Sequence, residues 1–257
     1  MAAPVNYGWR LLITGACFLA VSLVALAVSL TVFPTLRLLS GNARLGEQRV
    51  RWTISKLFGL LLGLLRTAGV MRLETSGLER LREASAVLVL ANHPSYIDVA
   101  VLLSAMPGAT CVVKTDLWRN PFFAGVVSAA GYVRNSDPEQ VIQACRRALA
   151  AGDAVIVFPE GTRSRPNAPL RFLRGAAHIA LGAGRPIVPV LLHCDPPTLT
   201  KGSRWYQIPS RAFRFRVSVR EELQPAQLAD LCQPPVIAAR RLTHALESYF
   251  SEELRTL

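Results

Sequence analysis

The stretch AVLVLANHPSYID, residues 86–98, carries the most information about the fold. Its first six residues form a short apolar run that is typical of a buried strand, and polar turn residues follow at once. Three further apolar runs, at 110–113, 154–158 and 187–192, are separated by segments with helical periodicity. This alternation predicts an α/β protein whose mixed sheet is flanked by helices.

Turn and cap residues sharpen the prediction. Residues 138–151 should form a helix, because Asp137 is a suitable N-cap and Gly152 a suitable end. Residues 211–219 alternate apolar and polar side chains, which predicts a strand with one buried side. A last helix is expected over 236–254, with one apolar side formed by Val236, Ala239, Leu242, Leu246 and Phe250.

The N-terminal region differs from the rest of the chain. Leu11 to Pro34 contains no charged residue and is long enough to cross a hydrocarbon core of about 20 residues. A cleaved signal peptide is the alternative, because Ala25 and Ala27 form a small-x-small site. The apolar run continues beyond that site through Phe33, so we expect an uncleaved transmembrane helix.

A second apolar stretch, Leu57 to Met71, is about 15 residues long and is interrupted by Arg66. It is short for a membrane span, so we predict a helix that lies in the membrane interface, with an ordinary buried helix as the alternative. The chain is therefore divided into a membrane anchor with an interfacial helix, residues 1–72, and an α/β domain, residues 73–257.

The net charge of +12 is concentrated near the apolar segment. Residues 1–72 contain eight Lys and Arg residues against Glu47 alone, and five of the eight lie between Arg37 and Lys56. The positive-inside rule then places the α/β domain on the cytoplasmic face of a membrane, and anionic headgroups should attract the basic stretch. No recognition helix, zinc-finger spacing or aromatic RNA-binding motif is present, so we predict no nucleic-acid partner.

The five cysteines are scattered and never spaced as C-x-x-C, which favours a reducing environment over disulfides. The run His193-Cys194-Asp195 contains ligand-type residues but no second pair at metal spacing. We therefore predict no metal site.

Two chemically promising strings follow predicted strands. In the first, Ser95 can cap a helix and place Asp98 in its first turn, within reach of His93. An aspartate that accepts from one imidazole nitrogen leaves the other nitrogen free as a general base. The alternative is a plain capping box beside a loop histidine.

The second string is FPEGTRSR, residues 158–165. Gly161 lets the backbone approach a ligand, while Thr162 and main-chain N–H groups can donate to phosphate oxygens. Arg163 offers a bidentate fork, and Glu160 can hold an arginine or a ligand hydroxyl in place. The alternative is a solvated turn in which Glu160 and Arg163 pair with each other.

Taken together, the strings resemble the H-x4-D and F-P-E-G-T-R motifs of the glycerolipid acyltransferase family, which includes the 1-acyl-sn-glycerol-3-phosphate acyltransferases. Further blocks resemble this family in the same order along residues 86–192. These blocks are Lys114-x-Asp116-Leu117 followed by Pro121, then Gly131-Tyr132-Val133-Arg134, and last Ile187-Val188-Pro189-Val190.

The resemblance implies a membrane-bound O-acyltransferase. A fatty acyl chain would move from an acyl carrier protein or coenzyme A thioester to a lysolipid hydroxyl, without a cofactor or metal. His93 would be the base and Asp98 its orienting partner, with direct attack by the hydroxyl. The implied substrate-binding residues are Glu160, Gly161, Thr162, Arg163, Lys114 and Arg134.

The sequence also departs from the family. Arg134 lacks the aspartate that often precedes it, and Arg174 stands where many members have lysine. The implied acceptor, 1-acyl-glycerol-3-phosphate, therefore has alternatives in another lysolipid, such as an amino-acid lysolipid, or a pathway-specific acceptor. A catalytically silent lipid-binding relative and a thioester hydrolase are the remaining readings.

Overall fold

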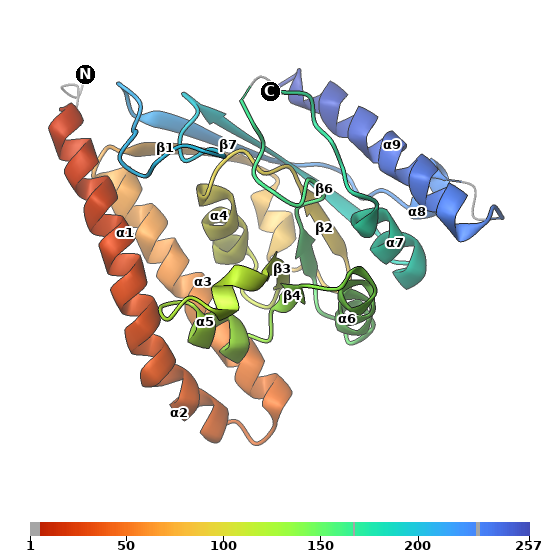
Figure 1. Cartoon of the computed structure of the whole chain (residues 1–257), viewed down its shortest axis with the longest axis horizontal. Helices are drawn as coiled ribbons and strands as arrows, with labels where there is room; N and C mark the ends of the chain where they lie inside the picture. Colours follow the sequence, from red (N-terminus) through yellow and green to blue (C-terminus); the bar gives the residue numbers. More distant parts are fainter. Residues whose placement is uncertain (1–5, 167, 230–231) are drawn as a thin grey trace.

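The computed structural model describes residues 6–166, 168–229 and 232–257 (Figure 1). In chain order its elements are α1 (Tyr7–Leu30), α2 (Val32–Leu38), α3 (Ala43–Thr67), β1 (Met71–Ser76), η1 (Leu78–Leu81), β2 (Leu88–Ala91), α4 (Ile97–Ala105), β3 (Thr110–Lys114), η2 (Thr115–Trp118), α5 (Ala124–Ala129), β4 (Val133–Asn135), α6 (Pro138–Ala150), β5 (Val155–Val157), α7 (Arg174–Ala183), β6 (Ile187–Asp195), β7 (Phe213–Val219), α8 (Pro225–Leu228) and α9 (Pro235–Leu254).

The strands form one mixed sheet in the order β1-β7-β6-β2-β5-β3-β4, which confirms the predicted fold class. Strands β6, β2, β5, β3 and β4 are parallel, whereas β7 runs antiparallel to β6. The carboxyl ends of the five parallel strands therefore share one side of the sheet, called here the carboxyl edge. Loops at this edge are the usual location of ligand sites in α/β proteins.

Helices cover both faces of the sheet (Figure 1). Side chains alternate along β2, so that Val89 and Ala91 pack with α3, α4 and α5, whereas Leu88 and Leu90 pack with α6, α7 and α9. The sheet thus separates two hydrophobic cores, one on each of its faces. Because β2 is buried on both of its faces, the position of the loop that follows it is fixed between the two helix layers.

The five predicted strands and the two helices predicted over 138–151 and 236–254 are present, with small differences at their ends. Asp137 caps α6 as expected, accepting from the N–H of Gln140 at 3.0 Å. One detail is wrong: Val236, predicted on the buried side of the last helix, is 62% exposed. The two edge strands, β1 and β4, have no counterpart among the predicted strands.

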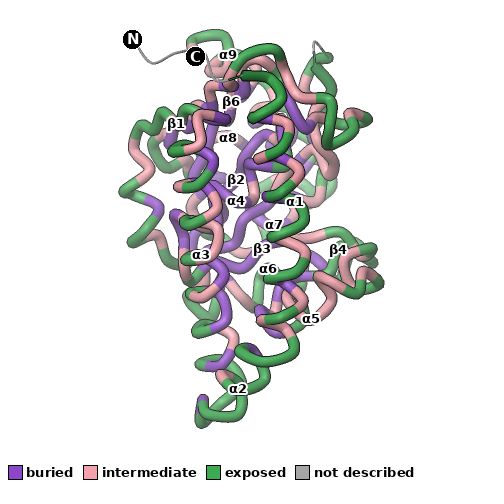
Figure 2. Tube along the Cα trace, turned by 90° about the vertical axis from the view of Figure 1, so that its left-hand side faces the viewer, coloured by how far each residue is buried: buried purple, intermediate pink, exposed green. Residues whose placement is uncertain are grey.

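The apolar N-terminal segment forms α1 and α2. Residues Tyr7–Leu38 meet the length and hydropathy expected of a membrane span, and only 17% of the most apolar window is buried. Figure 2 accordingly shows mostly exposed and intermediate residues along α1. Both ends of α1 nevertheless contact the domain: Arg10 donates to backbone carbonyls at 209–210, and a Cβ atom placed on Gly125 would lie 2.5 Å from Ser29.

Residues 57–67 of the second apolar stretch are the C-terminal part of α3 and not a separate helix. The predicted end of that helix is wrong, because Met71 is the first residue of β1. Its Leu62 and Leu65 are buried against the core, whereas Leu60 is 71% exposed and Leu64 is 49% exposed. The helix is therefore amphipathic. One side is buried in the core, as in the alternative of an ordinary buried helix, and the other side is exposed.

Arg51 corrects the expectation that the whole basic stretch faces headgroups. Its side chain is 5% exposed, pairs with Asp153 at 2.9 Å and donates to the carbonyl of Ala130 at 2.8 Å. The ion pair ties α3 to the α/β domain. Since β1 begins at Met71, the predicted boundary after residue 72 falls inside a strand, and the division into two domains stays a prediction.

Candidate active site

The first string lies at the carboxyl edge, directly after β2. The Asn92 side chain donates to the carbonyl of Leu192 and accepts from its N–H, both at 2.8 Å. These bonds join the end of β2 to β6 and hold the following residue, His93, at a defined place above the sheet.

His93 and Asp98 are brought together as the sequence predicted. Nδ1 of His93 lies 2.7 Å from Oδ2 of Asp98, which also accepts from the N–H of Ser95 at 2.9 Å. Asp98 lies in the first turn of α4, but the N-cap of that helix is Tyr96 and not Ser95. The Ser95 hydroxyl instead donates to the carbonyl of Thr198 at 3.0 Å.

The surroundings of this pair favour one orientation of the imidazole. Asp98 is fully buried, and burial raises its pKa to about 6, although the hydrogen bond with His93 and the N–H of Ser95 act in the opposite direction. The His93 ring stacks on Phe158, with ring centroids 4.1 Å apart, and its side chain is 15% exposed. With Nδ1 directed to Asp98, Nε2 is the nitrogen left for a substrate.

Glu160 connects the second string to the first. One of its carboxylate oxygens, Oε1, accepts from the backbone N–H of His93 and from the Ser164 hydroxyl, each at 2.8 Å. The N–H of Ser164 donates to the His93 carbonyl at 2.7 Å. Burial raises the pKa of Glu160. The carboxylate thus positions the His93 backbone, a role that the sequence analysis did not assign to it.

Gly161 is required by the shape of this turn. Its φ of +66° is in the left-handed region, and a Cβ atom would lie 2.6 Å from Cδ1 of Leu173. Thr162 is half-buried in the same turn.

The Arg163 side chain makes more contacts than the alternative of a solvated turn predicts. Its Nη1 donates to the carbonyls of Leu199 and Thr200 at 2.7 and 2.6 Å, and its guanidinium carbon lies 3.7 Å from the centroid of the Tyr96 ring. Three of the five guanidinium N–H groups remain outside these two bonds.

Lys114 and Arg134 lie further along the carboxyl edge. They are exposed at the ends of neighbouring strands, and Arg134 lies 5.6 Å from the ring centroid of Trp118. Strands β3 and β4 are two and three positions from β2, which corresponds to about 10 and 14 Å at the usual strand spacing. The structure therefore groups His93, Asp98, Glu160 and Arg163, with the other two basic residues at a distance.

The contacts that support His93 and Arg163 were not predicted from the sequence. Phe158 and Asn92 belong to the two strings, so a position for both of them beside His93 could have been predicted. No sequence pattern points to the carbonyl groups at 198–200, because they lie in an irregular loop more than 30 residues after Arg163.

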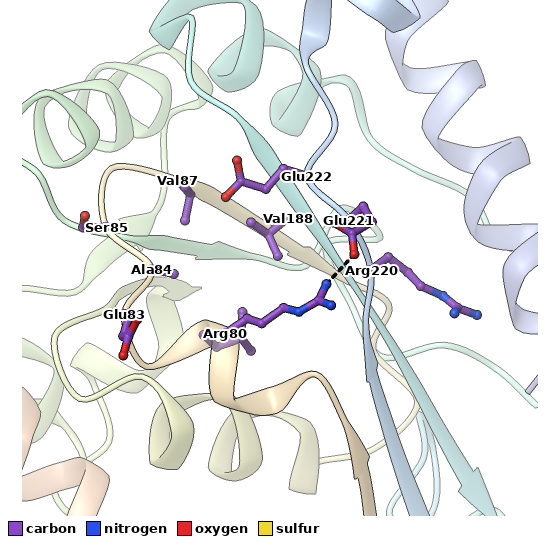
Figure 3. Close-up of a pocket in the computed structure, with 10 residues that line it drawn as sticks. Arg80, Glu83, Ala84, Ser85, Val87, Val188, Arg220, Glu221 and Glu222 are labelled. Atoms are coloured by element: carbon purple, nitrogen blue, oxygen red, sulfur yellow. Dashed lines mark hydrogen bonds and ion pairs between the residues drawn. The ribbon is translucent and has the colours of Figure 1, made fainter.

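Two cavities lie away from this group. One of about 270 Å³ opens at the opposite edge of the sheet, between Val87, Val188 and the Arg80–Glu221 ion pair at 2.6 Å (Figure 3). The other is lined by residues from the end of α3 and the start of β1. Neither includes His93. Among the described residues, no cluster of three His, Cys, Asp or Glu side chains is arranged to hold a metal ion.

Comparisons with known proteins show which proteins this chain is similar to. A family described as Acyltransferase matches residues 72–193, a range that contains both strings and the strands before them. Over these residues the chain is similar to the acyltransferase family. The relatives named below are acyltransferases, and the matched range contains His93, Asp98 and the arginine-containing turn described above.

Named relatives narrow the comparison. The chain is 28% identical over 193 residues to 1-acyl-sn-glycerol-3-phosphate acyltransferase alpha of Ovis aries, covering 64% of this chain and 67% of that protein. It is 31% identical over 136 residues to the chloroplastic acyltransferase BAT2 of Brassica napus, covering 51% of this chain and 40% of that protein.

A solved structure matches nearly the whole chain. The 1-acyl-sn-glycerophosphate acyltransferase PlsC from Thermotoga maritima superposes with a TM-score of 0.71 at 20% identity, over 96% of this chain and 98% of its own. At that identity the match supports the fold alone. It includes the N-terminal helices together with the α/β domain.

Proposed function

We propose that this acyltransferase moves a fatty acyl chain from a thioester to the free hydroxyl of 1-acyl-glycerol-3-phosphate and so forms phosphatidate. The observation that carries the proposal is the His93–Asp98 pair, joined at 2.7 Å through Nδ1 and set at the carboxyl edge. The names of the relatives, 1-acyl-sn-glycerol-3-phosphate acyltransferases, supply the acceptor. This function places the protein in phospholipid biosynthesis.

The chemistry needs one base and no enzyme nucleophile. Nε2 of His93 takes the proton of the acceptor hydroxyl as its oxygen forms a bond to the thioester carbonyl carbon. The tetrahedral adduct collapses, the carbon–sulfur bond breaks, and the imidazolium returns its proton to the leaving thiolate. The buried carboxylate of Asp98 stabilises the imidazolium in between.

The second string supports binding of the acceptor phosphate. Thr162 is half-buried in the turn, and Arg163 retains three N–H groups beside its two carbonyl bonds. Lys114 and Arg134 extend the positive charge along the edge, where they suit the phosphates of an acyl carrier protein or coenzyme A donor. We propose that this thioester is the co-substrate and that no metal or other cofactor takes part.

The exposed apolar side of α1 supports attachment to a membrane, with the α/β domain on the cytoplasmic face. Leu12, Leu19 and Leu23 on this helix are each at least half exposed. The contacts of Arg10 and Ser29 with the domain lie 19 residues apart, or about 28 Å along a helix. These contacts favour a helix that enters the membrane alongside the domain over one that crosses away from it.

The test is a product assay with purified full-length protein. Lysophosphatidate, other lysolipids and an amino-acid lysolipid are each incubated with acyl carrier protein and coenzyme A thioesters, and products are identified by mass spectrometry. Phosphatidate as the preferred product supports the proposal. A different acylated lipid changes the acceptor, free fatty acid alone indicates a hydrolase, and absence of any product indicates a silent relative.

A further inference from the structure

The segment between β6 and β7, residues 196–212, is called here the strap. It is irregular, contains the exposed aromatic residues Trp205 and Tyr206, and lies beside the first half of α1 (Figure 1). One end of the strap touches the candidate active site and the other end touches the apolar helix.

At the active-site end, three successive carbonyl groups of the strap are bound. Ser95 donates to Thr198 at 3.0 Å, and Arg163 donates to Leu199 and Thr200 at 2.7 and 2.6 Å. Leu199 is 7% exposed and has a φ of +53°, a conformation that leucine rarely adopts. The backbone here is thus held by its surroundings and not by local preference.

At the helix end, the strap is bound by side chains of α1. Arg10, itself 3% exposed, donates to the carbonyls of Pro209 at 3.0 Å and Ser210 at 2.5 Å. Trp205 packs where α1 has no side chain, because a Cβ atom on Gly15 would lie 3.1 Å from the indole ring. The Phe18 ring is 6.2 Å from the same ring, measured between centroids.

We propose that Trp205 is a positioning residue, which holds the strap against α1 so that the carbonyls of Leu199 and Thr200 fix Arg163 for the acceptor phosphate. The chain of contacts is short. α1 holds Trp205, the strap holds Arg163, and Arg163 neighbours Ser164, whose N–H binds the His93 carbonyl.

The consequence is a link between the lipid-facing helix and the bound acceptor. When Trp205 leaves its place, two bonds that orient the guanidinium lose their fixed partners, and three free N–H groups no longer point in one direction. Misplacement of a binding group by about 1 Å can change rates up to 10²-fold, so a ten-fold effect on acceptor binding is expected. This inference rests on the proposed function, because it assigns Arg163 to the phosphate of the acceptor.

The experiment uses full-length protein in detergent micelles and a short-chain, water-soluble lysophosphatidate at saturating thioester. Trp205→Ala should raise KM for this acceptor about ten-fold and change kcat less than about two-fold. Trp205→Phe should restore most of the affinity. Gly15→Val, which pushes on the indole from the side of α1, should reproduce the defect if Trp205→Ala fails to fold.

Trp52→Ala is the matched control. Trp52 is 54% exposed on α3, and the ammonium of Lys56 lies 5.0 Å from the centroid of its ring. Its loss should leave KM for the soluble acceptor unchanged. An equal rise in KM for Trp52→Ala and Trp205→Ala would overturn the proposal, because a general loss of exposed aromatic surface would then explain both.

A double-mutant cycle tests the link to Arg163. If Trp205 acts through Arg163, the Trp205→Ala change should add little once Arg163→Ala is present. Effects that multiply would overturn the proposal.

Amide hydrogen exchange separates this proposal from the proposed function. Faster exchange of residues 160–165 in Trp205→Ala and Gly15→Val, but not in Trp52→Ala, supports the strap even if wild-type protein prefers another acceptor. If exchange at residues 160–165 is unchanged in protein that does form phosphatidate, the positioning role of Trp205 and the strap is overturned, and the proposed function remains intact.

Discussion

Replacing Asp98 by asparagine should separate stability from activity. The carboxylate is fully buried, and its Oδ2 accepts from His93 and from the N–H of Ser95. Its other oxygen, Oδ1, is buried and has no hydrogen-bond partner among the residues that the structure describes. Asp98→Asn keeps the shape of the side chain and removes the charge.

The magnitude follows from the pKa. Burial raises the pKa of Asp98 from 3.8 to about 6, which corresponds to about 3 kcal/mol of preference for the neutral form in the folded protein. Because the folded pKa lies above the unfolded one, this contribution to stability is present below about pH 4 and is lost as the pH rises through 6. At pH 7.5, Asp98→Asn should therefore unfold with a free energy equal to that of wild-type protein or as much as about 3 kcal/mol higher.

Activity should move in the opposite direction. A neutral amide cannot stabilise the imidazolium of His93, so acyl transfer should fall by about 10² to 10⁴. For the same reason, wild-type activity should decline as the pH falls below about 6, where Asp98 takes up a proton.

The assay is denaturant unfolding, followed by tryptophan fluorescence, between pH 4 and 8, together with phosphatidate formation at pH 7.5. Asp137→Asn is the control, since Asp137 caps α6 from an exposed position and asparagine caps helices equally well. An Asp98→Asn protein that is clearly less stable than wild type at pH 7.5, or that keeps wild-type turnover, would refute the reasoning.

Three other predictions test the surrounding turn and the membrane helix. Gly161→Ala should destabilise the protein by about 1 to 3 kcal/mol in thermal unfolding, because φ is +66° and the new methyl group meets Leu173; Leu173→Ala should recover only part of this loss. Glu160→Gln should keep much of the transfer rate, since an amide oxygen can still accept from His93 N–H, whereas Glu160→Ala should lower the rate and increase amide exchange at His93. Tyr7→Cys in intact cells should resist a membrane-impermeant maleimide added from outside if α1 lies alongside the domain, and labelling from outside would show that the helix crosses.

The sequence predicted those parts of the fold in which local signals agree. Strands β2, β5 and β6 are short apolar runs bounded by turns, and their sides are buried by helices on both faces. Strands β1 and β4 were missed because β1 mixes charged with apolar residues and β4 has only three residues. As edge strands they pair on one side only, so burial leaves a weaker pattern in their sequences.

The candidate site shows the same limit. His93 and Asp98 are five residues apart, so the short turn between β2 and α4 brings them together locally. Arg51 was expected to face headgroups, but its partner Asp153 is 102 residues away, and no local pattern reports that distance. The strap carbonyls that bind Arg163 are backbone atoms, and backbone atoms carry no sequence signature.

The most direct test of the account is the rate of phosphatidate formation by purified His93→Ala protein. With Nδ1 directed to Asp98, Nε2 of this residue is the base assigned to the acceptor hydroxyl. The account predicts a loss of about 10² to 10⁴ in kcat, with an unfolding transition like that of wild-type protein. A folded His93→Ala protein that forms phosphatidate at a rate near wild type would contradict it.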